Sequence, residues 1–100
     1  MATLHVLSAS PFASDHFAGC LPLLGAGDGL LLCGDAVYAL RAATAQRRQL
    51  EQLAPEIALF ALAEDVEARA LGDRPARVAL LDYPGFVELC GRFERVNSWL

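Results

Sequence analysis

Short, unbroken apolar runs of strand length are the feature that most constrains how this chain folds. Residues 30–33 (LLLC) have none of the alternation of polar and apolar side chains that marks a strand with one wet face. Such a strand is buried on both faces, which is typical of a parallel sheet covered by helices on both sides. Similar runs recur along the chain and alternate with segments of helix length. This alternation predicts a single three-layer, doubly wound α/β domain with a mostly parallel sheet over residues 1–100.

Capping and turn residues indicate where the helices begin and end. Ser10 followed by Pro11 is a typical helix start, and Pro22 should kink or end that helix because its ring opposes a carbonyl of the preceding turn. Asp35 is expected to cap a second helix, and Pro84 to start the last one. Strands are expected at residues 3–7, 30–33, 57–62 and 77–82, and residues 95–100 are expected to form a short terminal strand or an extended arm. Helices are expected at residues 11–24, 36–41, 47–54, 64–71 and 84–93.

The composition limits what the chain does alone. A domain of this size buries about two-thirds of its extended surface, and 55% of its residues are apolar. We therefore expect part of the apolar excess to face another subunit. Asp28 and Asp35 interrupt the richest apolar region, so no run is long enough to cross a membrane, and the first residues do not resemble a signal peptide. Three cysteines without the spacing of a disulfide scaffold favour a reduced, cytoplasmic protein.

The charge balance excludes several classes of function. Eight arginines and no lysine face twelve acidic residues, which gives a net charge of −4. Because neutralisation of phosphates dominates affinity for nucleic acids, we expect no strong direct binding of RNA or DNA. Without a lysine, the chain has no P-loop, forms no Schiff base and carries out no pyridoxal chemistry.

The motifs predict neither a cofactor nor a metal site. His5, His16 and Cys20 lack the paired spacing of zinc ligands. The glycines within residues 25–29 imitate a dinucleotide fingerprint, but they precede a strand instead of following one. One alternative stays open: a stand-alone module that binds a small ligand or Mg²⁺ through acidic residues placed after the strands. Helix capping explains two of these acids, Asp35 and Asp65, more simply. The four acids of this rim are Asp35, Glu64, Asp65 and Asp82.

Cys20 is the thiol with the best case for reactivity. It lies four residues after His16, so both side chains can share one helix face, where a protonated imidazole would favour the thiolate. Its position late in the helix opposes this, since the helix macrodipole disfavours an anion there. Cys33 and Cys90 have no cation close by in sequence and are expected to lie in the core.

Five short patterns, taken in order, resemble the TusB/DsrH family of sulfur-relay subunits. None is diagnostic alone, but their order and spacing together cover nearly the whole chain. They are LHVLSASPF (4–12), GDGLLLCGDAVYA (27–39), LAEDVEARAL (62–71), LLDYPGFVELC (80–90) and the closing WL (99–100).

The resemblance implies a DsrE/DsrF/DsrH-like fold and a supporting, non-catalytic subunit. Such subunits assemble with two homologous partners, the C and D subunits, into a heterohexamer of two trimers. The complex takes persulfide sulfur from an upstream carrier protein and passes it to a downstream one, and the relay ends in 2-thiolation of the wobble uridine of tRNA. The principal sulfur-carrying cysteine is on the D subunit. This chain would then be mainly structural, with Cys20 as a secondary sulfur carrier.

A second branch of the family stays open. DsrH-type subunits serve sulfur oxidation in the cytoplasm and carry a cysteine near the end of the first helix, and Cys20 matches that position. On this alternative Cys20 would be an active persulfide carrier. Neither branch requires a metal or a nucleotide.

Overall fold

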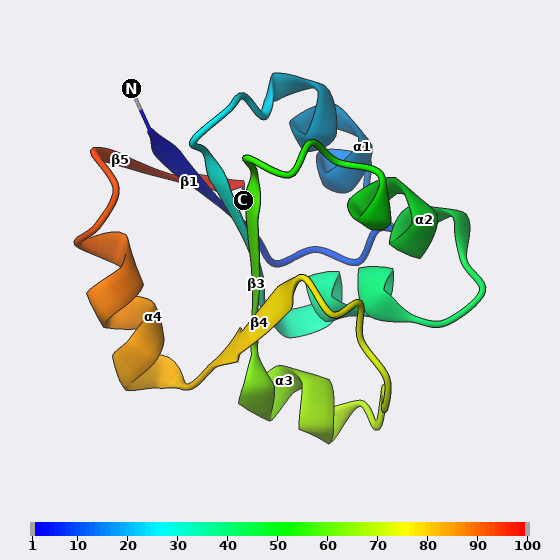
Figure 1. Cartoon of the computed structure of the whole chain (residues 1–100). Helices are drawn as coiled ribbons and strands as arrows, with labels where there is room; N and C mark the ends of the chain where they lie inside the picture. The colour runs from blue at the N-terminus through cyan, green and yellow to red at the C-terminus, as the bar shows by residue number, and fades with distance from the viewer. Residues whose placement is uncertain (1, 100) are drawn as a thin grey trace.

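Five strands form one parallel sheet in the order β4-β3-β2-β1-β5 (Figure 1). The computed structural model describes residues 2–99. The central strand β2 is buried at all four positions, as its unbroken apolar run predicts. The last strand was expected to reach Leu100, which lies outside the described residues. The strands are β1 (Thr3–Leu7), β2 (Gly29–Leu32), β3 (Ala58–Leu62), β4 (Val78–Leu81) and β5 (Arg95–Trp99).

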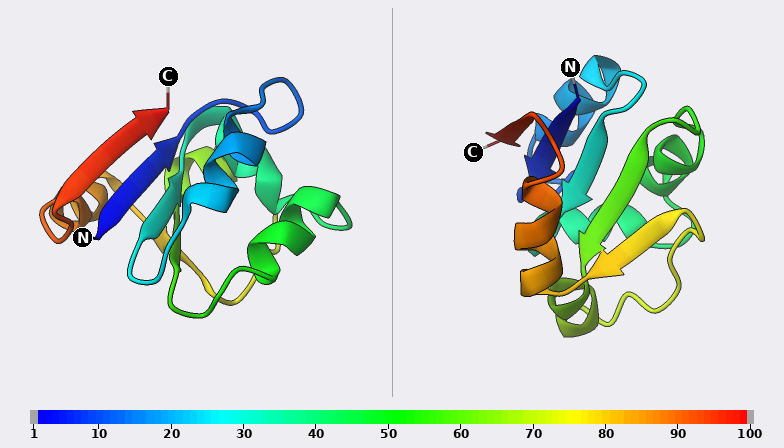
Figure 2. Two further views of the ribbon diagram at one scale, coloured as in Figure 1. Left: turned by 90° about the horizontal axis from the view of Figure 1, so that it is seen from above. Right: turned by 60° about the vertical axis from the view of Figure 1, so that its left-hand side comes forward.

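Helices cover the two faces of the sheet unequally. Right-handed crossovers step from β1 to β4 in one direction and place their helices on one face, whereas the last crossover returns from β4 to β5 over the other face. Among the described helices, α4 alone therefore covers the second face (Figure 2). This confirms the predicted doubly wound arrangement. The helices are α1 (His16–Cys20), α2 (Ala45–Glu51), α3 (Ala63–Ala68) and α4 (Tyr83–Cys90), with the 3₁₀ helices η1 (Leu21–Leu23) and η2 (Gly34–Leu40).

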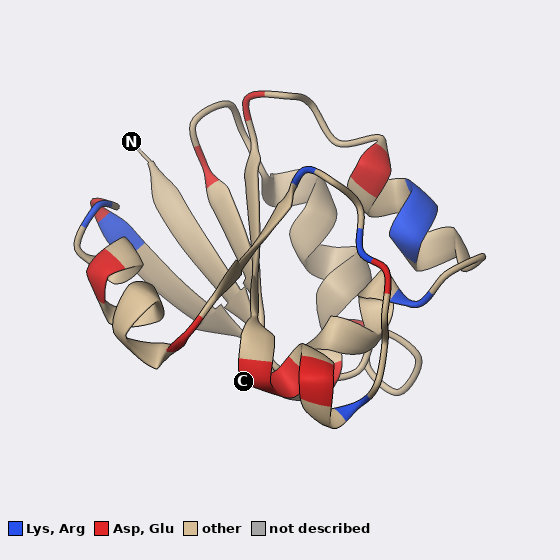
Figure 3. Cartoon of the chain, turned by 60° about the horizontal axis from the view of Figure 1, so that its bottom comes forward, with Lys and Arg blue, Asp and Glu red and all other residues tan. Residues whose placement is uncertain are grey.

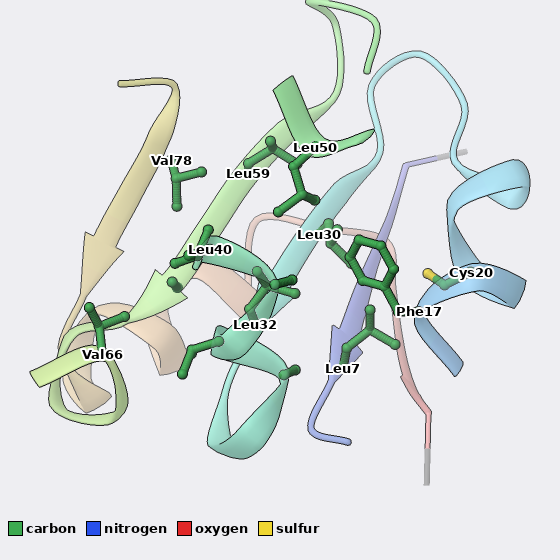
Figure 4. Packing of buried hydrophobic residues seen from close by; sticks show 14 of the residues in the cluster. Leu7, Phe17, Cys20, Leu30, Leu32, Leu40, Leu50, Leu59, Val66 and Val78 are labelled. Atoms are coloured by element: carbon green, nitrogen blue, oxygen red, sulfur yellow. The ribbon is translucent and has the colours of Figure 1, made fainter. Parts of the chain in front are cut away.

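One hydrophobic core lies on each face of the sheet. The larger core fills the space between the sheet and the helices of the first face, and it contains Leu7 and Leu30 (Figure 4). The smaller core lies beneath α4 and contains Val6 and Leu31. Neighbouring residues of one strand thus enter opposite cores, because successive side chains of a strand point to opposite faces.

The first helix begins later than the sequence predicts. Ser10 does accept a hydrogen bond from the Phe12 N–H (3.2 Å), but the turn that it closes is not continued. The α-helix starts only at His16, where Phe17 and Cys20 reach the core, whereas Phe12 is 52% exposed. A helix this short depends on burial of its apolar face. The Ser-Pro start, whose neighbour Phe12 is exposed, is therefore not sufficient to begin the helix at residue 11. Pro22 ends the α-helix as predicted, and the chain continues as η1.

The second predicted helix is a 3₁₀ helix, and Asp35 does not cap it. Its first N–H, that of Gly34, instead donates to a carboxylate oxygen of Asp65 (2.8 Å), which belongs to α3. Asp35 binds Arg69 (2.9 Å). Asp65 was expected to cap its own helix, yet α3 has no side-chain cap. Both predictions were wrong because β2 and β3 are neighbours in the sheet, so the segments that follow them lie side by side. Each of the two acids therefore binds a group of the other segment and not of its own helix end.

The remaining boundaries differ by a few residues. Thr44 caps α2 by accepting from the Arg47 N–H (3.2 Å), so this helix begins two residues before the predicted range. Asp82 caps α4 through the Gly85 N–H (2.8 Å), and α4 ends at Cys90, before the predicted end. None of the helices described in residues 2–99 is long and apolar enough to cross a bilayer.

Candidate functional site

A cavity of about 440 Å³ lies at the edge of the sheet where the strands end. The cavity extends from the ends of β2 and β3 to those of β1 and β5, and so includes the point where the strand order reverses, between β1 and β5. Ligands of open α/β sheets usually bind at such a point. Most of its lining is apolar, with a thiol, two serines, a tyrosine and one carboxylate among the walls. The lining residues are Val6, Ser8, Cys33, Gly34, Leu62, Asp65, Tyr83, Phe86, Ser98 and Trp99.

Cys33 is the thiol at this cavity. It follows β2 directly, is half-buried, and its Sγ donates to the Leu7 carbonyl at 3.4 Å. Burial raises the pKa of the Cys33 thiol, and the negative charge of Asp65 raises it further. A reactive cysteine needs the opposite surroundings, an electropositive and accessible site. The prediction that Cys33 is a packing residue agrees with its contacts with the smaller core.

The acidic residues beside the cavity are engaged by an arginine. Arg69 binds Asp35 through both Nε (3.2 Å) and Nη2 (2.9 Å) and lies 3.7 Å from Asp65. The hydrogen bond to Asp35 raises the pKa of Arg69. Figure 3 shows acidic residues gathered on and around α3. Within residues 2–99, no three His, Cys, Asp or Glu side chains lie close enough to hold a metal ion together. The acidic rim therefore does not converge as a Mg²⁺ module needs.

Cys20 is fully buried at the end of α1 and faces the larger core (Figure 4). Burial raises the pKa of this thiol from 9.0 to about 11, and the charge of Asp28 adds to the effect. His16 does not offset this burial. Its ring lies near the Trp99 ring, with 6.1 Å between centroids, and its Nδ1 is buried without a hydrogen-bond partner in the described chain. Cys20 as a sulfur carrier stays a prediction, and reaching its thiol requires α1 to move.

Cys90 lies on the sheet side of α4. It is half-buried and contacts the smaller core. The three cysteines therefore occupy three separate places: α1, the end of β2 and α4.

A hydrogen bond that sequence reasoning missed joins the two ends of the chain. The Trp99 indole Nε1 donates to Nδ1 of His5 at 3.2 Å, across 94 positions of sequence. Both residues lie on the face of the larger core, since Leu7 of β1 pairs with Trp99 of β5. The alternation within residues 3–7 indicates that His5 shares the face of Leu7, but only the strand order brings Trp99 beside it.

The doubly wound parallel sheet and the cavity at its switch point define a small open α/β domain. Residues 9–96 match the family described as DsrH like protein, and the chain belongs to that family. The resemblance seen in the sequence is thereby confirmed.

Relatives and a solved structure agree with this assignment. The chain is 42% identical over 99 residues to Protein TusB of Escherichia coli K12, covering 96% of this chain and 99% of the relative. It is 39% identical over 97 residues to Protein TusB of Serratia proteamaculans, with the same coverage. The crystal structure of the YchN protein of Escherichia coli superposes with a TM-score of 0.79, covering 99% of this chain and 100% of that one. Its 17% sequence identity makes this a likeness of fold.

Proposed function

We propose that this chain is a supporting subunit of a sulfur-relay complex that leads to 2-thiolation of the wobble uridine of tRNA. The observation that carries the proposal is the similarity to Protein TusB over 96% of the chain at about 40% identity. In this role the chain holds the complex together, and a cysteine on a homologous partner carries most of the sulfur. The relay would operate in the cytoplasm, where thiols stay reduced.

The surroundings of the thiols support a structural role. Transfer of persulfide sulfur needs an accessible thiolate, because the thiolate is the attacking species. Burial raises the pKa of both Cys20 and Cys33, and Cys20 has no exposed surface. Neither thiol is therefore prepared for fast exchange while the chain holds this conformation.

The surface supports assembly with other subunits. Helices normally cover both faces of a parallel sheet, and here α4 is the only described helix on the second face. Several large apolar side chains are 45–70% exposed, which is consistent with partners that cover them. These side chains are Phe12, Leu23, Tyr83, Val87 and Val96.

Co-expression with the homologous C and D subunits tests the proposal. We expect one stable complex that contains all three chains, with the mass of two trimers in analytical ultracentrifugation. A chain that remains monomeric beside its folded partners would contradict the proposal.

The DsrH-type alternative assigns the carrier role to Cys20, and the match to the DsrH like family keeps this alternative in view. In that reaction the Cys20 thiolate attacks the outer sulfur of a donor persulfide. A new S–S bond forms, the S–S bond of the donor breaks, and the donor leaves as a thiolate, so no oxidant is consumed.

Mass spectrometry separates the two roles. After incubation with a persulfide donor protein, an active carrier gains the mass of one sulfur atom, loses this gain in Cys20→Ala and keeps it in Cys33→Ala. The supporting role predicts no gain on this chain while the D subunit of the same complex becomes persulfidated.

A further inference from the structure

Four polar side chains meet on the uncovered edge of the sheet. Thr3 and His5 of β1 and Arg95 and Asn97 of β5 line a cavity of about 490 Å³, together with Val96. The cavity is separate from the one at the other end of the strands. Figure 2 shows β1 and β5 side by side at this edge.

The register places these four side chains in one group. Thr3 pairs with Arg95 and His5 with Asn97, and alternate residues of a strand share a face. Side chains two residues apart on a strand are about 7 Å apart, and those on neighbouring strands about 5 Å apart. At these spacings, all four side chains are close enough to contact the same small ion.

The tautomer of His5 makes it a hydrogen-bond donor toward this patch. The Trp99 indole nitrogen only donates, so Nδ1 of His5 is the acceptor in their hydrogen bond. The proton of the neutral imidazole is then on Nε2. No hydrogen bond from Nε2 is found among residues 2–99, although His5 is only 7% exposed and lines the cavity. Nε2 is not cut off from solvent, because His16 Nδ1 is the one fully buried side-chain nitrogen or oxygen without a hydrogen-bond partner among residues 2–99. His5 Nε2 is therefore free to donate to an acceptor that enters the cavity.

Arg95 supplies a positive charge that is paired with no acidic side chain of residues 2–99. Every salt bridge in the described chain involves another arginine, and none involves Arg95. Asp28 is the acidic residue near His5, and its carboxylate already accepts from the N–H groups of Thr3 and Gly25, each at 2.9 Å. Among residues 2–99, the patch thus offers one unpaired cation, Arg95, and several neutral donors.

We infer that this patch is a binding site for a small oxyanion. The His5 Nε2–H and the Arg95 guanidinium hold the anion, and the Asn97 amide and the Thr3 hydroxyl complete its hydrogen bonds. The chemistry suits a free tetrahedral oxyanion, such as sulfate or phosphate, or a carboxylate. This inference does not depend on the proposed sulfur-relay function, because it concerns the isolated chain.

Trp99 provides the readout, since it is the only tryptophan and is hydrogen-bonded to His5. The full chain is titrated with sodium sulfate at constant ionic strength, balanced with sodium chloride, and tryptophan emission is followed. We expect a saturable change with a dissociation constant on the order of 1 mM. Isothermal titration calorimetry on the same samples measures binding without relying on fluorescence.

Two variants test the location of the site. Arg95→Gln removes the charge and should weaken binding at least about tenfold, because hydrogen bonds to charged groups are the strong ones. Arg92→Gln is the matched control: Arg92 is exposed and bound to Glu88, and binding should be unchanged. Circular dichroism verifies that both variants are folded.

Sodium acetate in place of sulfate distinguishes the two kinds of oxyanion. Tighter binding of acetate than of sulfate would identify a carboxylate ligand, and the reverse a tetrahedral oxyanion. The inference is overturned if no saturable heat or emission change occurs up to about 50 mM of either anion, or if Arg95→Gln binds as well as Arg92→Gln.

Discussion

The side chain of Arg77 holds the loop between α2 and β3 in place through hydrogen bonds. Its guanidinium donates to the carbonyls of Leu53, Ala54 and Ile57, and so satisfies groups that the end of a helix leaves free. Five donors in a fixed planar fork allow one arginine to do this, and a lysine has no such geometry.

Replacing this residue should therefore destabilise the fold. Arg77→Ala is expected to lower the free energy of unfolding by about 2 kcal/mol, since hydrogen bonds from a charged donor are lost. Urea denaturation followed by circular dichroism measures the loss. Arg92→Ala, which removes an exposed pair with Glu88, should cost less than about 0.5 kcal/mol. If both variants lose the same free energy of unfolding, the hydrogen bonds of Arg77 stabilise the fold no more than an exposed ion pair does.

The buried thiol of Cys20 predicts a pH dependence of stability. Its pKa is about 11 in the folded chain and 9.0 ordinarily, so between these values the unfolded chain binds fewer protons than the folded one. Stability is then fully present below pH 9 and falls as pH rises toward 11, by at most ~1.4 kcal/mol per pH unit. Denaturation at several pH values should show a smaller fall in Cys20→Ala. The same fall in both proteins would mean that Cys20 does not titrate in this way.

At the scale of the elements, capping decides where helices begin only where burial agrees. Asp82 meets both conditions, because its carboxylate accepts from Gly85 N–H while Leu89 of the same helix is buried. Ser10 meets only the first condition, and no helix continues from it.

The cap of α4 gives a direct test. Asp82→Ala should lower the free energy of unfolding by about 1 kcal/mol, the usual effect of removing such a cap. Asp73→Ala changes an acid in an exposed connection and should have almost no effect. Thermal unfolding of the two variants side by side makes the comparison. If both variants unfold at the same temperature as the wild-type chain, the Asp82 hydrogen bond does not stabilise α4.

At the scale of the whole molecule, the last strand joins the sheet beside the first. β5 is exposed at four of its five positions, so few apolar contacts hold it in place. The Trp99–His5 hydrogen bond and the contact of Trp99 with the larger core attach it to the face that α1 covers.

Removing that hydrogen bond should loosen this edge. Trp99→Phe keeps an aromatic ring but leaves Nδ1 of His5 without its donor, and we expect a loss of about 1–2 kcal/mol. Hydrogen exchange should increase first in the amides of β5. Tyr83→Phe, which changes a side chain that is 55% exposed, is the control and should be neutral. Unchanged exchange in β5 of Trp99→Phe would rule out this role for the hydrogen bond.

Much of the fold follows from the sequence because burial leaves a local pattern. The run of leucines in β2 predicts a strand covered on both faces, and Pro22 and Pro84 predict a helix end and a helix start within a residue or two. The family resemblance likewise depends on short ordered patterns and is confirmed over residues 9–96.

Only the tertiary structure decides which distant residues meet. Asp65 binds Gly34, Arg69 binds Asp35, and Trp99 binds His5 because β3 lies beside β2 and β5 beside β1. No periodicity in a single segment specifies strand order, since each strand buries its side chains equally well at several places in a sheet. The burial of Cys20 is decided in the same way, because a helix five residues long takes its orientation from the core that it covers.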